Sequence, residues 1–173
     1  MSDPFQVLEQ EHRLISKLLD ALAKAVERDM PLGYYERAVQ FIAVYANEFH
    51  HAKEEDILYR YLIDHGMPRD YGPLGIVLEE HDYGDEHVAA MRAQLEAGDL
   101  PGLVETIKMY VELLRQHVAT EDDLLLPMGR AMLTEEEVAE VAGRFEGVAD
   151  PEPSLKHYED LVEQLGAEVE VPA

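Results

Sequence analysis

Apolar residues near the start of the chain recur at alternating steps of three and four positions. The series is Phe5, Leu8, Ile15, Leu19, Leu22 and Val26. This spacing is typical of a helix that buries one face in a bundle, and His12 is its one interruption. Asp3 followed by Pro4 predicts the start of the helix, and the stretch MPLG at 30–33 predicts its end.

Similar patterns predict three more long helices, over about residues 34–65, 74–97 and 101–127. Gly66 and Pro68 mark the end of the first of these, and Gly98 marks the end of the second. Strand signals are absent from the sequence. Because the connections are short, we expect an all-α fold, an up-down-up-down four-helix bundle.

The remainder of the chain is less regular and predicts two short helices. Thr134 and Glu137 have the spacing of a capping box, and Ser154 is placed to cap a last helix that ends at Gly166. We therefore expect residues 1–130 to form the bundle and residues 131–173 to form a C-terminal helical extension that packs on it.

Polar residues interrupt the apolar face of every long helix. On a helical wheel of about 100° per residue, six side chains point toward the bundle axis. They are His12, His50, Glu54, His81, His117 and Glu121. His51 and Glu55 fall on the opposite, polar side of the second helix, so we expect both to be solvated.

The polar positions also repeat along the chain. HHAKEEDIL at 50–58 is echoed by HVATEDDLL at 117–125, and EQEHRLI at 9–15 is echoed by EEHDYGD at 79–85. The repeat predicts two α-hairpins related by a pseudo-two-fold axis.

Ionised carboxylates in a dry core cost several kcal/mol unless they are paired or bound to metal. Protonated histidines could pair with the glutamates, which would give a metal-free polar core. Six converging groups in a repeated pattern favour a metal site instead. The chain contains no cysteine, and imidazole with carboxylate ligands suits iron, manganese or zinc.

A ferritin-like site would use Glu-x-x-His pairs. Glu9 with His12 and Glu48 with His51 have that spacing. We reject this alternative because Glu48 and His51 are predicted to point away from the core, and because the third and fourth helices supply no copy.

With an early histidine, HHAKEED at 50–56, EHD at 80–82 and HVATED at 117–122, the sequence resembles the hemerythrin-like, or HHE cation-binding, family over about residues 5–130. The resemblance implies an oxo- or hydroxo-bridged di-iron site, with manganese and zinc as the alternatives. It implies terminal ligands at His12, His50, His81 and His117, and bridging carboxylates at Glu54 and Glu121.

Two aspartates are further candidate ligands. Asp85 stands where the oxygen-carrying members of the family have a second histidine on the third helix. Asp122 has the spacing of their fourth-helix aspartate. A ligand set with fewer histidines and more carboxylates is harder and should favour ferric iron. Among the tyrosines of the second helix, Tyr45 and Tyr61 are candidates to reach the metal pocket.

The resemblance implies a protein that binds oxygen or a related small molecule, such as peroxide or nitric oxide, for sensing, storage or detoxification. A redox enzyme with an external electron donor and an iron-responsive interaction module without catalysis are the alternatives. The net charge of −23 disfavours nucleic acid and anionic membranes as partners. The stretch MSDPFQVLEQEH at 1–12 lacks the features of a secretory signal, and no apolar run approaches a membrane span, so we expect a cytoplasmic protein.

Overall fold

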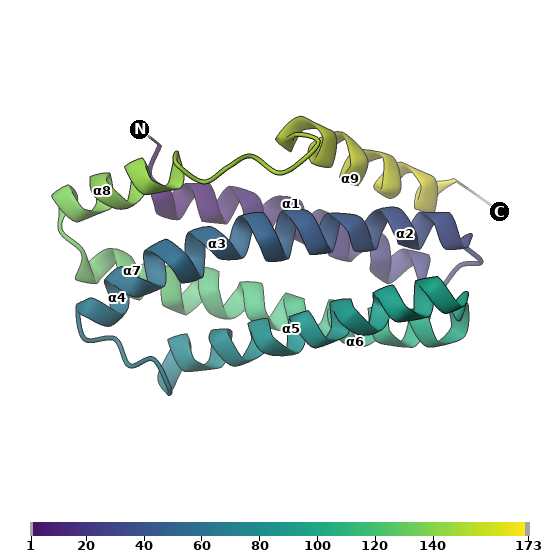
Figure 1. Cartoon of the computed structure of the whole chain (residues 1–173), viewed down its shortest axis with the longest axis horizontal. Coiled ribbons are helices and arrows are strands. Elements are labelled where there is room, and N and C mark those ends of the chain that lie inside the picture. The colour runs from purple at the N-terminus through teal and green to yellow at the C-terminus, as the bar shows by residue number, and fades with distance from the viewer. Residues whose placement is uncertain (1, 172–173) are drawn as a thin grey trace.

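The computed structural model describes residues 2–171, and this part of the chain is helical without any strand. Met1 of the predicted bundle lies outside the described residues, and so do Pro172 and Ala173 of the predicted extension. Four long helical segments lie side by side (Figure 1). They are α1 (Pro4–Ala25), the segment 32–64, α5 (Gly72–Ala97) and the segment 100–132.

Two of the long segments change their helical winding along their length. The second comprises α2 (Leu32–Phe41), η1 (Ile42–His50), α3 (His51–Lys53), η2 (Glu54–Leu58) and α4 (Tyr59–Asp64). The fourth comprises α6 (Leu100–Thr120), η3 (Glu121–Leu125) and α7 (Leu126–Met132). The η stretches are π-helical, with hydrogen bonds to the fifth residue, so they turn by less than 100° per residue.

The helix ends follow the local sequence at most positions. The Asp3 side chain accepts hydrogen bonds from the backbone N–H groups of Phe5 and Gln6 at the start of α1. Gly98 ends α5 in a left-handed conformation, at φ 67°, which favours glycine. Thr134 and Glu137 form the predicted capping box of α8 (Glu135–Phe145).

Two helices continue beyond their predicted ends, whereas α1 ends at Ala25, before the predicted stretch at 30–33. The fourth segment continues past Pro127 to Met132, because the π-helical turn before it places the proline at the start of a new α-helical stretch. The last helix, α9 (Leu155–Glu170), continues past Gly166. A glycine inside a helix lowers its stability by only about 1 kcal/mol, and the burial of Val169 beyond it outweighs that loss.

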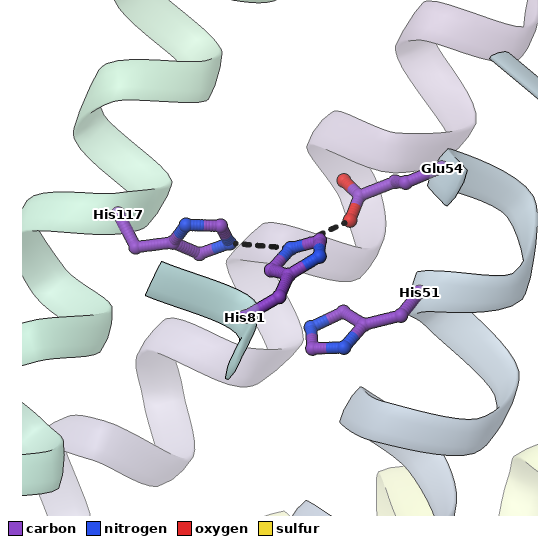
Figure 2. Close-up of side chains that lie close together, drawn as sticks. All are labelled: His51, Glu54, His81 and His117. Atoms are coloured by element: carbon purple, nitrogen blue, oxygen red, sulfur yellow. Dashed lines mark hydrogen bonds and ion pairs between the residues drawn. The ribbon is translucent and has the colours of Figure 1, made fainter. Parts of the chain in front are cut away.

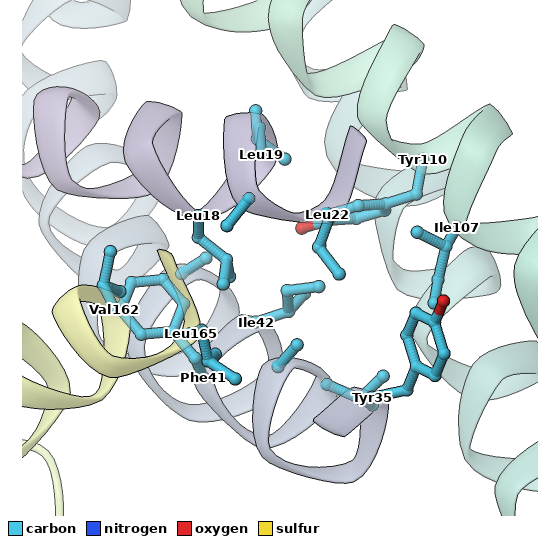
Figure 3. Packing of buried hydrophobic residues seen from close by; sticks show 14 of the residues in the cluster. Leu18, Leu19, Leu22, Tyr35, Phe41, Ile42, Ile107, Tyr110, Val162 and Leu165 are labelled. Atoms are coloured by element: carbon cyan, nitrogen blue, oxygen red, sulfur yellow. The ribbon is translucent and has the colours of Figure 1, made fainter. Parts of the chain in front are cut away.

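The C-terminal helices α8 and α9 pack against α1. Val162 and Leu165 of α9 lie with Leu18 and Phe41 in one apolar cluster (Figure 3). A second apolar cluster fills the other end of the molecule and includes Phe145 of α8. The predicted inward histidines and glutamates lie between the two clusters along each long segment. No helix in residues 2–171 combines the length and apolar character that crossing a bilayer requires.

The division of the chain into bundle and extension remains a prediction, which a core substitution in α9 can test. Leu165→Ala should lower the free energy of unfolding by about 2–5 kcal/mol, because it empties a fully buried site between α9 and the bundle. Leu124→Ala, on an exposed position, should change it by less than about 0.5 kcal/mol. Equal urea midpoints for the two variants would show that α9 does not pack on the bundle in solution.

Candidate metal centre

Four histidine rings meet in the middle of the molecule as two facing pairs. The Nε2 atoms of His12 and His50 lie 3.1 Å apart, and those of His81 and His117 lie 3.2 Å apart. All four side chains are buried. The first pair joins α1 to the second segment, and the second pair joins α5 to α6. Each α-hairpin therefore contributes one pair.

Two glutamates with no exposed surface reach both pairs. Glu54 directs Oε1 toward the Nε2 atoms of His12 and His50, at 3.4 and 3.2 Å. Its other oxygen lies 3.5 Å from Nε2 of His81 (Figure 2). Glu121 places Oε2 at 3.2 Å from the Nε2 atoms of both His12 and His117. Each carboxylate is thus positioned between the two hairpins.

A carboxylate accepts a hydrogen bond from the outer ring nitrogen, Nδ1, of each of these histidines. The four bonds join His12 to Asp122 (2.7 Å), His50 to Glu11 (2.9 Å), His81 to Glu55 (2.6 Å) and His117 to Glu80 (3.1 Å). Metal-binding histidines usually have such an acceptor, which fixes the ring and leaves the Nε2 lone pair for the metal.

These outer carboxylates follow the sequence repeat. Glu11 and Glu80 directly precede the histidines of α1 and α5, and each accepts from the histidine of the next segment in its own hairpin. Glu55 and Asp122 directly follow the central glutamates, and each accepts from the opposite hairpin. The pseudo-two-fold relation therefore extends beyond the six inward residues.

The charges of the centre compensate one another. Burial alone would lower the pKa of His50, but the carboxylates of Glu54 and Glu11 outweigh it and raise the pKa to about 9. Against the same effect of burial, carboxylates also raise the pKa values of His12 and His81. Burial would raise the pKa of Glu54, yet the surrounding rings hold it well below its usual range, so this carboxylate is ionised.

The arrangement fits metal ions. Both oxygens of Glu54 and Oε2 of Glu121 are buried and accept no hydrogen bond. Two facing Nε2 atoms 3.1–3.2 Å apart cannot both carry a proton, because their N–H groups would then oppose each other. Without a metal, the three buried oxygens would also stay without a hydrogen-bond donor, which is costly in a core. Two groups of four donors have their ligand atoms within 4.8 Å of one another. They are His12, His50, Glu54 and Glu121, and His51, Glu54, His81 and His117.

His51 was predicted to be solvated, and that prediction is wrong. Only 9% of its surface is exposed, and its ring stacks on His81 with centroids 3.8 Å apart (Figure 2). The wheel of about 100° per residue fails here because η1 and η2 flank the short α3 and shift its rotation. Glu55 is exposed as predicted, but it also holds Nδ1 of His81.

The sequence pattern did not identify two further residues of the second segment that contact the centre. Tyr59 donates a hydrogen bond to Oε1 of Glu121. The wheel favoured Tyr45 and Tyr61, but Tyr45 packs on Phe41 in the apolar cluster, and the guanidinium of an α8 arginine covers the ring of Tyr61. Lys53 is buried and bound to Glu11, behind His50. The only sequence signals for these two residues were their positions, with Lys53 directly before Glu54 and Tyr59 five residues after it.

The two candidate aspartates occupy different surroundings. Asp122 is half-buried and reaches the centre through His12 rather than through the inner ligand positions. Asp85 is exposed and accepts a hydrogen bond of 2.6 Å from Asn47. It lies outside both donor groups found among residues 2–171.

Comparison with protein families gives one match. The model described as the Hemerythrin HHE cation binding domain matches residues 3–129. Searches of curated proteins and of solved structures returned no significant match.

The two adjacent glutamates should respond differently to substitution. Glu54→Ala should lose bound metal, because Glu54 is the one residue that belongs to both donor groups. Glu55→Ala should keep the metal content but weaken affinity about 10- to 100-fold, because it frees Nδ1 of His81. Elemental analysis and chelator competition measure both, with the exposed Glu36→Ala as control. Metal loss in Glu55→Ala and retention in Glu54→Ala would contradict this assignment.

Metal should reverse the pH dependence of stability. Without metal, the raised pKa of His50 adds stability below its unfolded value of about 6.5 that is lost as pH rises through about 9. With Zn²⁺ bound, protons compete with the ion, so stability should fall as pH decreases. Urea midpoints at pH 6 and 9, with chelator or with Zn²⁺, test this. A metal-free protein that gains stability toward pH 9 would contradict it.

Proposed function

Because this chain belongs to the hemerythrin HHE cation-binding domain family, we propose that it holds two iron ions at the centre of an up-down-up-down four-helix bundle. We further propose that it binds oxygen, peroxide or nitric oxide there, for sensing or detoxification. The observation that carries the proposal is the pair of buried glutamates whose free oxygens lie between two sets of facing imidazole nitrogens.

Different residues would hold each of the two ions. His12 and His50 would hold one ion, and His81 and His117 the other, with Glu54 and Glu121 shared between them. Bound iron would supply an electron-exchanging centre for a small molecule. The two apolar clusters on either side exclude water, and Tyr59 fixes the carboxylate of Glu121.

The donor set supports reaction or sensing over reversible carriage. Carboxylates at the outer nitrogens of four imidazoles increase the basicity of those ligands. Together with the two buried glutamates, they stabilise the higher oxidation state of a hard metal. Asp85 stands in place of a histidine and supplies no nitrogen donor to the centre. Its exposed carboxylate accepts a hydrogen bond from Asn47 instead.

Absorption spectroscopy of the iron-loaded protein tests the proposal. After reduction with dithionite, mixing with air should restore the ferric charge-transfer bands quickly. Removal of oxygen should not return the reduced spectrum. Asp85→His should leave the rate of oxidation unchanged, because position 85 lies outside the donor groups. Chelator-treated protein is the control.

Two results would contradict the proposal. A colourless protein that binds only stoichiometric zinc would exclude a di-iron centre. A reduced spectrum that returns each time oxygen is removed would identify a carrier instead.

A further inference from the structure

His51 differs from the other histidines of the centre in its hydrogen bonding. Each of the other four donates Nδ1 to a carboxylate. Within residues 2–171, neither ring nitrogen of His51 makes a hydrogen bond to another protein group, although only 9% of the residue is exposed. Metal-binding histidines almost always have an acceptor on the second nitrogen. His51 is therefore not oriented as a permanent ligand.

The sequence repeat leads to the same conclusion. His50 and Glu54 align with His117 and Glu121, so the position equivalent to His51 is Val118. The second hairpin thus supplies its histidine and glutamate without any counterpart of His51. The symmetric part of the centre is complete without this residue.

On its outer side, His51 lines a surface pocket of about 200 Å³. The other lining residues are Asn47, Glu48, Ala52, Glu55 and Asp56. Among the six, His51 is the most buried, so it lies at the base of the pocket below three carboxylates.

The carboxylates of the pocket are engaged to different degrees. Asp56 pairs with Arg60 at 2.8 Å, and Glu55 accepts from His81. Glu48 forms no ion pair in the described part of the chain. Asp85 adds a fourth carboxylate next to the pocket through its bond with Asn47.

On its inner side, His51 reaches the metal centre. One of its nitrogens lies within 4.8 Å of ligand atoms of Glu54, His81 and His117. Figure 2 shows its ring beneath that of His81, on the side of the centre from which α3 approaches. One buried, unpartnered imidazole therefore connects an acidic surface pocket with the carboxylate that both hairpins share.

We propose that this pocket is a transient binding site for divalent metal ions, and that His51 passes each ion inward to Glu54. The inference rests on the proposed function. Carboxylates concentrate cations at the pocket by electrostatic attraction. A ring without a fixed hydrogen bond can turn between the pocket and the centre. The outer carboxylates on the other histidines keep those rings in place to receive the ion.

Uptake of Co²⁺ by the full-length, metal-free protein tests the proposal. Stopped-flow absorbance follows the appearance of the Co²⁺ bands, and elemental analysis gives the final content. His51→Phe retains an aromatic ring against His81 but removes both nitrogens, and it should slow uptake about tenfold at low salt with the final content unchanged. Glu48→Gln, at an exposed position, should slow uptake severalfold, and 0.5 M salt should remove that difference.

Two controls separate the route from general effects of charge and of histidine loss. Glu36→Gln removes an exposed carboxylate elsewhere on the second segment, and His157→Phe replaces an exposed histidine of α9. Both should take up Co²⁺ at the rate of the unmodified protein.

The proposal is overturned if folded His51→Phe takes up Co²⁺ at the unmodified rate. It is also overturned if His51→Phe loses one equivalent of Co²⁺, because His51 would then be a permanent ligand. If His51→Phe does not fold, the rate measured for Glu48→Gln decides. Failure of the unmodified protein to bind either Co²⁺ or Fe²⁺ would contradict the proposed function itself.

Discussion

Two ionised carboxylates lie at the centre of this molecule with no contact to solvent, and their desolvation must be compensated from every side. Glu54 and Glu121 explain why each long helical segment interrupts its apolar face with a histidine. They also explain why the core is split into two apolar clusters with a polar layer between them. The compensation of charge extends outward to carboxylates such as Glu11. The desolvation of Glu11 is in turn offset by its buried contact with the ammonium group of Lys53.

Regular α-helices made part of this centre predictable from the sequence. Apolar spacing placed His12 and His81 correctly because α1 and α5 keep one winding throughout. The same reasoning misplaced His51, since π-helical turns change the rotation per residue and have no simple sequence signature. It also ended the fourth segment at Pro127, where a π-helical turn lets the helix continue. The outer carboxylates were visible as an echo in the sequence, but which histidine each would bind depends on how the hairpins pack.

The centre is symmetric in its repeated residues and asymmetric in three others. His51, Lys53 and Tyr59 all belong to the second segment, and the aligned positions in the fourth segment hold valine, threonine and leucine. These three residues contact, respectively, the ring of His81, the carboxylate behind His50 and one oxygen of Glu121. The repeated residues supply the inner donors of both halves. The three unrepeated residues belong to one hairpin only, and they make the two halves chemically different.

The buried contact between Lys53 and Glu11 gives that difference a consequence for metal composition. The ammonium group offsets the negative charge that Glu11 presents to His50, whereas Glu55, which is exposed, keeps its charge beside His81 without a lysine or arginine bound to it in residues 2–171. Imidazoles backed by an uncompensated carboxylate are stronger donors. The imidazoles of His50 and His81 would then differ in donor strength, and the two metal positions would differ in affinity.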